Sequence, residues 1–264
     1  MKNFFRNYAM KSFLGSGGVA LNNQDKTITQ NGTYTADEGY TGLGNVTVNV
    51  ARDDQTDIEE QFVRLIEGNA NNLVTSLPSG LTSIRKRSFN QYDNIALTSL
   101  PSGVTSIGEE AFSGCSKLAL TFLPDGLTTI EGYTFNRCTK LALTSLPSGI
   151  VTVGSYAFNS CSKLALTDLP NGLTKIDSYG FSSCTAMVLT SIPASVTTIG
   201  SNAFYNCSGF ASLTFEGKPS SIASNAFNVC NNLKTINVPW AEGEVANAPW
   251  GATNATINYN YTGG

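Results

Sequence analysis

The six cysteines are the residues of this chain best suited to chemistry, because a thiolate is both a nucleophile and a metal ligand. They recur every 23 residues, at Cys115, Cys138, Cys161, Cys184, Cys207 and Cys230. No Cys-x-x-Cys pair occurs and the 264 residues include no histidine, so no zinc-ligand set is recognisable. Side chains at equivalent positions of stacked units point in parallel, which leaves disulfides as the less favoured alternative. We therefore expect six buried free thiols, no metal site and no cofactor.

Other catalytic groups are scarce. The absence of histidine removes the commonest general base. The carboxylate pairs Asp53-Asp54, Glu59-Glu60 and Glu109-Glu110 are adjacent in the sequence, as expected for solvated charge rather than for acids that converge across a cleft. No glycine-rich phosphate loop with a following lysine is present. We expect no catalytic residues and no enzyme activity.

The charge balance also limits the possible partners. The formal net charge is −3 and only 13% of the residues are charged, which does not indicate a nucleic-acid partner. No segment reaches the roughly 18 apolar residues needed to cross a bilayer, so no membrane insertion is expected. The surface should be rich in hydroxyl and amide groups, which suit proteins or glycans.

The elements that position these residues repeat with a period of 23. Two apolar columns keep this register: Phe89, Phe112, Phe135, Phe158, Phe181, Phe204 and Phe227, and Ile84, Ile107, Ile130, Val153, Ile176, Ile199 and Ile222. Self-similarity at a fixed period predicts a solenoid of stacked coils, in which each coil is one 23-residue unit and neighbouring coils share one core.

The unit resembles the BspA-like type of bacterial leucine-rich repeat. The residues that carry the resemblance are Cys115, Leu118, Leu123, Pro124, Leu127, Ile130, Phe135 and Cys138. The resemblance covers seven coils, about residues 73 to 233. It implies a right-handed stack of short parallel strands, and proteins of this type are usually adhesive or binding modules rather than enzymes.

Within each coil the pattern predicts four local structures. They are a strand at the Leu-Thr-x-Leu step, a turn at Pro-x-Gly, a second extended piece at Leu-Thr-x-Ile and a helical turn around Ala-Phe. The glycines of the Pro-x-Gly step, of which Gly103 and Gly172 are two, are expected at positive φ.

Four further segments flank the repeats. An arm of residues 1–18 precedes a small β module of residues 19–54, in which Asn31-Gly32 predicts a hairpin. A capping helix is expected over residues 55–72, because Thr56 and Glu59 form a capping box. Residues 234–264 should close the other end as a β cap, with the two Pro-Trp pairs covering the last coil.

Candidate binding residues lie in the columns that vary while the repeat is kept. The position two before the phenylalanine holds a tyrosine in three consecutive coils, at Tyr133, Tyr156 and Tyr179. A second variable column contains the apolar Phe122 and the acidic Asp168. Tyrosine suits protein or sugar contacts, although a purely structural aromatic ladder is the alternative. The basic stretch Arg85-Lys86-Arg87 is interpreted as a solvated edge.

Two functions follow from these features. The β module and the C-terminal segment resemble stretches found in phage tail and other virion proteins, and no signal peptide or wall anchor is recognisable. The first hypothesis is therefore a structural and receptor-binding protein of a phage tail, located in the virion and presenting the repeats to a protein or glycan on a host cell. The alternative is a bacterial cell-surface or secreted adhesin.

We expect the arm of residues 1–18 to attach the protein to its assembly. Its aromatic residues Phe4, Phe5, Tyr8 and Phe13 could form one side of a short helix that docks on other tail proteins. A homo-oligomer formed through the same arm is also possible.

Overall fold

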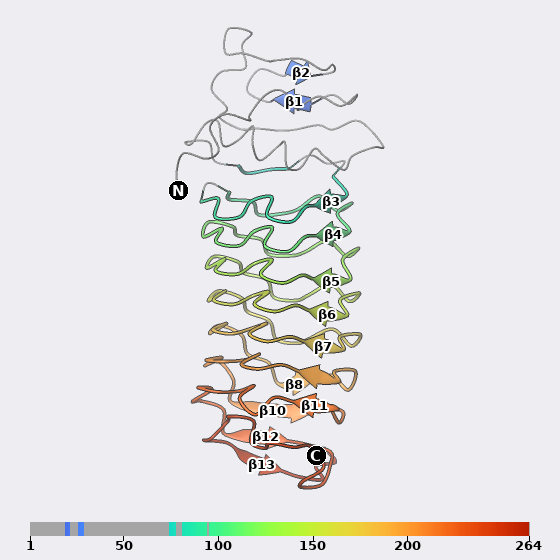
Figure 1. Ribbon diagram of the computed structural model, residues 1–264, viewed down its shortest axis with the longest axis vertical. Coiled ribbons are helices and arrows are strands. Elements are labelled where there is room, and N and C mark those ends of the chain that lie inside the picture. The colour runs from blue at the N-terminus through green and yellow to red at the C-terminus, as the bar shows by residue number, and fades with distance from the viewer. Residues whose placement is uncertain (1–18, 22–25, 29–73, 78–80, 94, 264) are drawn as a thin grey trace.

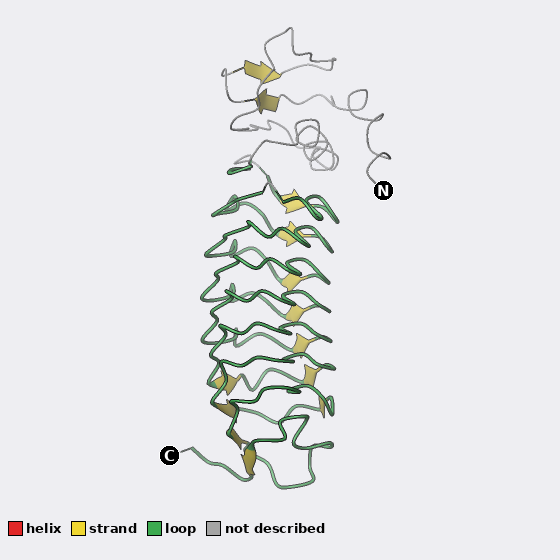
Figure 2. Cartoon of the chain, turned by 90° about the vertical axis from the view of Figure 1, so that its left-hand side faces the viewer, coloured by secondary structure: helices red, strands yellow, loops and turns green. Residues whose placement is uncertain are grey.

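The described part of the chain is a stack of coils. The computed structural model describes residues 19–21, 26–28, 74–77, 81–93 and 95–263. Within these ranges no helix is present, and the chain winds through short strands joined by turns (Figures 1 and 2). Strands β1 (Val19–Leu21) and β2 (Lys26–Ile28) form an antiparallel pair. The prediction of a parallel-strand repeat solenoid is confirmed.

Each coil contributes a two-residue strand at its Thr-x-Ile step. The strands are β3 (Ser83–Ile84), β4 (Ser106–Ile107), β5 (Thr129–Ile130), β6 (Thr152–Val153), β7 (Lys175–Ile176), β9 (Thr198–Ile199) and β11 (Ser221–Ile222). They pair in parallel in two sheets, β3-β4 and β11-β9-β7-β6-β5, with a register of one repeat, so that Thr129 lies opposite Thr152. The second residue of every strand is buried, because it faces the core shared by the stack.

A second sheet forms only towards the C-terminal end. It contains β8 (Ser191–Ile192), β10 (Ser212–Phe215), β12 (Thr235–Asn237) and β13 (Thr256–Asn258), in the order β13-β12-β10-β8. A strand at this step was predicted in every coil, and that prediction is wrong for the earlier coils. There, neighbouring coils share single backbone bonds, such as the one from the Ala142 N–H to the Leu120 carbonyl at 3.1 Å.

The predicted helical turn around Ala-Phe is also wrong. In most coils the residues two before and two after the phenylalanine have a left-handed backbone, as Tyr156 (φ 56°) and Ser160 (φ 62°) do around Phe158. Alternate backbone N–H groups then point to the next coil, and the Phe158 N–H donates to the Gly180 carbonyl at 2.8 Å. A helix would direct these N–H groups along its own axis, so the hydrogen bonds between coils replace it.

The described glycines of the Pro-x-Gly step, Gly103, Gly126, Gly149 and Gly172, do not have the predicted positive φ. The glycines with positive φ lie elsewhere, at Gly114, Gly243, Gly251 and Gly263. Ser195 occupies the same step in a later coil and donates from Oγ to the Leu173 carbonyl at 2.7 Å. A side chain is therefore tolerated at this step, and the recurrence of glycine there is not a demand for left-handed backbone.

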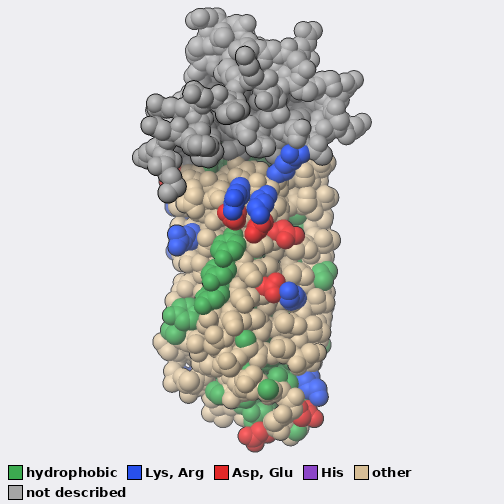
Figure 3. All heavy atoms as spheres, viewed as in Figure 1, with side chains coloured by type: hydrophobic (Ala, Val, Ile, Leu, Met, Phe, Trp, Pro, Cys, Tyr) green, Lys and Arg blue, Asp and Glu red, His purple; other side chains and the backbone are tan. Residues whose placement is uncertain are grey.

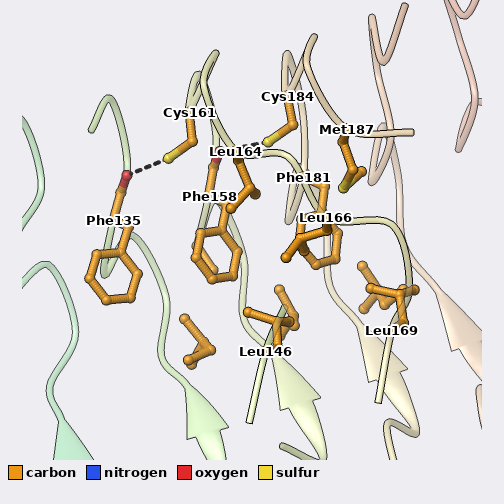
Figure 4. Packing of buried hydrophobic residues seen from close by; sticks show 14 of the residues in the cluster. Phe135, Leu146, Phe158, Cys161, Leu164, Leu166, Leu169, Phe181, Cys184 and Met187 are labelled. Atoms are coloured by element: carbon orange, nitrogen blue, oxygen red, sulfur yellow. Dashed lines mark hydrogen bonds between the residues drawn. The ribbon is translucent and has the colours of Figure 1, made fainter. Parts of the chain in front are cut away.

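The core is built from stacked identical residues. The phenylalanine rings lie parallel along the axis, with centroids 5.5 Å apart for Phe135 and Phe158 and 5.4 Å apart for Phe158 and Phe181 (Figure 4). These distances fall within the range of favourable offset stacking. Phe158 is fully buried. The expectation that this column forms the core is confirmed.

Tryptophans close the C-terminal end of the stack. Trp240 and Trp250 are both buried, with ring centroids 6.3 Å apart, and both pack against Phe215. The two tryptophans therefore pack on one another and on Phe215, while the assignment of residues 234–264 as a β cap stays a prediction. The arm of residues 1–18, the hairpin at Asn31-Gly32 and the capping helix over residues 55–72 lie outside the described residues and stay predictions.

Candidate functional site

The cysteines form a buried ladder of free thiols, as predicted. Each Sγ donates a hydrogen bond to the backbone carbonyl of a phenylalanine in the preceding coil, at 3.0 Å from Cys161 to Phe135 and 3.1 Å from Cys184 to Phe158 (Figure 4). Each of these carbonyls also accepts a backbone N–H: the Phe158 carbonyl, which accepts the Cys184 thiol, accepts the Cys161 N–H at 3.1 Å. The thiol therefore satisfies the second lone pair of a buried oxygen.

Burial makes these thiols poor nucleophiles. It raises the pKa of Cys115 to about 12 and that of Cys230 to about 11, and it raises the pKa of the four thiols between them still more clearly. A neutral buried thiol does not attack a substrate or bind a metal ion. In the described ranges no three cysteine or acidic side chains converge on a point where a metal ion could sit.

The described carboxylate pair is used in ion pairs. Glu110 accepts two hydrogen bonds from the Arg87 guanidinium, at 2.7 and 3.0 Å, and Glu109 pairs with Lys86 of the same neighbouring coil. The hydrogen bonds from Arg87 lower the pKa of Glu110. Both acids are thus paired with Lys86 and Arg87 of the basic stretch, so these two cations are not free to attract an anion. The pairs Asp53-Asp54 and Glu59-Glu60 lie outside the described residues.

The three predicted tyrosines stack on one another. The ring centroids are 4.7 Å apart for Tyr133 and Tyr156 and 4.5 Å apart for Tyr156 and Tyr179, with planes within 9° of parallel. All three residues have a left-handed backbone, with φ between 56° and 59°. Burial, together with the neighbouring tyrosines, raises the pKa of the Tyr156 hydroxyl. Tyr133 is 36% exposed, and the other two are half-buried.

The stacking decides what the tyrosines can offer. Both faces of the Tyr156 ring are covered by neighbouring rings, so only its edge and its hydroxyl are available to a partner. A ring edge carries partial positive charge and suits oxygen atoms or the face of another aromatic ring. The flat faces of the middle ring are therefore not available to a partner, and the role of the three tyrosines in binding stays a prediction.

The tyrosines belong to a longer column, which we call the tyrosine ribbon. It contains the residues two before each phenylalanine in six successive coils: Arg87, Glu110, Tyr133, Tyr156, Tyr179 and Asn202. Each described contact along it joins neighbouring coils, ending with the Asn202 amide that donates to the Tyr179 hydroxyl at 2.8 Å. In Figure 3 a diagonal stripe of hydrophobic side chains begins below a group of basic and acidic side chains. The stripe crosses a surface that is otherwise mostly uncharged and polar.

The other two predicted site residues lie elsewhere on the coil. Phe122 and Asp168 precede the Pro step, two coils apart in one column, with Ser145 between them. Phe122 is 54% exposed, and Asp168 is exposed. The structure therefore gives an exposed apolar side chain and an exposed acid that belong to a different column from the tyrosines.

Sequence reasoning misses one exposed column. Lys117, Lys140 and Lys163 occupy equivalent positions of three successive coils, and their 23-residue spacing is the signal that would find them. The predicted attachment residues Phe4, Phe5, Tyr8 and Phe13 lie outside the described residues. Among the residues that the structure describes, no helix has the length and apolar composition required to span a lipid bilayer.

Comparison with known proteins identifies the repeat. The sequence matches the family model for the BspA type leucine rich repeat region in six copies, over residues 69–188 and 152–246, which together make up more than half of the chain. No curated protein matches the sequence.

Solved structures show the same fold. A leucine-rich cell surface protein of Faecalibacterium prausnitzii is similar with a TM-score of 0.51 and 21% identity, over 87% of this chain and 70% of its own. A leucine-rich repeat protein of T. pallidum shares 26% identity over 73% of this chain and 77% of its own, with a TM-score of 0.40 that is too low to add to the argument. The resemblance of the flanking segments to phage tail proteins is not shown by these comparisons.

Proposed function

Because this chain belongs to the BspA-type leucine-rich repeat family, we propose that it is a non-enzymatic recognition protein of a bacterial cell surface. It acts as an adhesin-like module that binds a protein partner along the tyrosine ribbon. Leucine-rich repeat solenoids generally serve as interaction scaffolds, and a stack of coils offers a long surface for this purpose. The Faecalibacterium prausnitzii neighbour is itself described as a cell surface protein, which is the location proposed here.

The observation that carries the proposal is the exposed edge of the stacked tyrosines. Tyr133, Tyr156 and Tyr179 are held by left-handed backbone and by one another, so they lose little side-chain entropy on binding. Tyrosine is enriched at protein interfaces for this reason and for its hydroxyl. Since the inner ring faces are covered, contact through edges and hydroxyls favours a protein partner over a sugar that stacks on an open ring.

The chemistry of the remaining residues supports the same proposal. The thiols are buried and neutral, and the described glutamate pair is bound to Lys86 and Arg87. Among the described residues, these are groups whose types could have served catalysis. A recognition role uses the surface of the coils and requires none of them.

A cell-binding experiment tests the partner. Labelled full-length protein is mixed with intact cells, and with cells treated with trypsin or with periodate. We expect binding to fall at least tenfold for the triple variant Tyr133→Ser, Tyr156→Ser, Tyr179→Ser, and to be lost after trypsin. Tyr261→Ser is the matched control, since Tyr261 is 37% exposed but lies outside the ribbon. Loss after periodate alone would show that a glycan is the ligand, and equal binding by the triple variant would exclude the ribbon.

Location is tested separately. Mass spectrometry of washed envelopes from an uninfected culture should detect the protein, because a surface adhesin stays with the cell. Detection in purified phage particles instead would restore the virion hypothesis, in which the arm with Phe4, Phe5, Tyr8 and Phe13 attaches the protein to the tail. Deleting residues 1–18 would then abolish incorporation into particles.

A further inference from the structure

We propose that Lys117, Lys140 and Lys163 form a second binding surface, the lysine rail, for a linear acidic polysaccharide with one carboxylate on each sugar. The rail is a different column from the tyrosine ribbon. Binding at the lysine rail therefore does not depend on binding at the tyrosine ribbon, and the two are tested by different experiments.

The core fixes the position of each rail lysine. The lysines occur in the segments Cys-Ser-Lys-Leu, Cys-Thr-Lys-Leu and Cys-Ser-Lys-Leu, and the cysteine and leucine of every segment are fully buried. The Leu141 N–H donates to the Cys138 carbonyl at 3.0 Å, which closes a tight turn with Lys140 at its exposed side. The turn repeats in the neighbouring coils, from Leu118 to Cys115 and from Leu164 to Cys161. The three lysines therefore start from equivalent points, spaced by the rise of one coil, about 4.8 Å.

Acidic residues are absent from the rail segments themselves, and Asp93 of the preceding coil accepts a hydrogen bond from the Ser116 hydroxyl at 3.5 Å beside the first of them. The segments 113–119, 136–142 and 159–165 contain no aspartate or glutamate, and Arg137 adds a further exposed cation. The ion pairs found between two described residues are those of Lys86, Arg87, Lys175 and Lys218, and Lys140 and Lys163 are not among them. Like charges placed opposite one another on stacked strands are destabilising. An anionic chain that lies along the column would reverse this repulsion.

The spacing and the neighbours indicate the class of ligand. One cation per coil fits a polymer with one anion per unit whose units are about as long as the coil rise, as in a chain of uronic acids. Ser116, Thr139 and Ser162 precede the lysines and offer hydroxyl groups beside each ammonium. Single-stranded nucleic acid is less suitable, because its recognition uses aromatic side chains for base stacking. The three rail segments contain no aromatic residue.

Titration with a defined polyuronate tests the rail. Full-length protein is titrated by calorimetry with oligogalacturonate, with the methyl-esterified form of the same oligomer, and with an oligothymidylate. We expect binding to the free acid that weakens as salt is added, because the contacts are ionic. Binding of the methyl ester should be at least tenfold weaker. Equal binding of acid and ester, or equal binding of the oligothymidylate, would overturn the assignment.

Two charge-matched variants locate the site. Lys117→Gln, Lys140→Gln, Lys163→Gln removes the rail, and Lys86→Gln, Lys175→Gln, Lys218→Gln removes three exposed lysines elsewhere. We expect the rail variant to lose at least tenfold in affinity and most of the salt dependence, while the control stays within twofold of the parent. A similar loss in both variants would show that net charge alone is responsible. Thermal melting of each variant verifies that the fold is kept.

Discussion

Single residues of this solenoid act through their copies in neighbouring coils. The carbonyl of Phe158 accepts both the Cys161 N–H and the Cys184 thiol, and its ring lies between those of Phe135 and Phe181. One residue type at one position of the coil thus contributes a ring to the core and an acceptor to the thiol ladder. A change at this position disturbs two neighbours as well as its own coil.

Replacing Phe158 by alanine should destabilise the fold by about 3 to 5 kcal/mol, because the fully buried ring leaves a cavity between two rings that are held by their own coils. Phe122→Ala is the matched control. Phe122 is 54% exposed, and its loss should change the free energy of unfolding by no more than about 0.5 kcal/mol. Urea denaturation followed by circular dichroism measures both. Equal effects of the two substitutions would contradict the assignment of the phenylalanine column to the core.

The sequence predicts which residues form columns and which columns are buried. It only partly predicts the backbone conformation and the side-chain packing within each column. Periodicity alone places Phe158 and Cys161 inside, since apolar residues at a fixed spacing must share a core. The same spacing reveals that Tyr156 follows Tyr133. It does not reveal that both residues have positive φ, which is uncommon for bulky side chains and directs the rings into a stack with covered faces.

At the scale of the element, hydrogen bonds between coils replace regular secondary structure. Sequence patterns predict local elements from local preferences, so Ala-Phe suggested a helical turn and Pro-x-Gly suggested a glycine at positive φ. The prediction of a helical turn failed because alternate N–H groups bond to the next coil. The Pro-x-Gly turn is closed within its own coil, by the Leu173 N–H that donates to the Pro170 carbonyl at 2.9 Å, without a left-handed glycine. A backbone N–H such as that of Phe158 finds its acceptor 22 residues away, at Gly180, and no local pattern contains this information.

Two glycines of neighbouring coils should respond differently to alanine. A Cβ at Gly154 would lie 2.7 Å from the Gly132 nitrogen and 2.9 Å from the Glu131 carbonyl carbon, so Gly154→Ala forces two coils apart. We expect a loss of about 1 to 3 kcal/mol. At Gly172 the nearest atom is the Ser148 oxygen at 3.6 Å, and its φ is not positive. Gly172→Ala should therefore be neutral or stabilise by about 0.4 to 1 kcal/mol.

Thermal denaturation of the two variants under identical conditions decides this prediction. A marked fall in the midpoint for Gly172→Ala would mean that the Pro-x-Gly step needs glycine after all. An unchanged midpoint for Gly154→Ala would mean that neighbouring coils can separate at low cost, which conflicts with the close backbone approach at this position.

At the scale of the whole molecule, the six buried thiols shift the pH dependence of stability in the same direction. Each coil contacts its neighbours, so all six equivalent thiols are buried along the stack. They stay protonated together in the folded chain and become exposed together when it unfolds. All six thiols therefore lower the free energy of unfolding as the pH becomes alkaline.

The last prediction is that the protein loses stability above about pH 9. The folded pKa of every thiol is raised by burial, to about 11 at Cys230, to about 12 at Cys115 and clearly upward for the other four. An unfolded cysteine titrates near 8.5, so the unfolded chain releases protons first. The stabilising contribution is complete below the unfolded pKa and falls as pH rises towards the folded values. Each thiol then contributes a loss of up to about 1.4 kcal/mol per pH unit.

Urea denaturation at pH 7, 8, 9 and 10 under reducing conditions measures this slope. Cys161→Ala provides the comparison. The substitution lowers stability at pH 7 through lost packing, but its free energy of unfolding should fall less steeply above pH 9, because the unfolded chain has one thiol fewer to ionise. The slope, rather than the absolute stability, is therefore the readout. A parent protein as stable at pH 10 as at pH 8, or equal slopes for parent and variant, would show that the thiols are not the groups that couple this fold to alkaline pH.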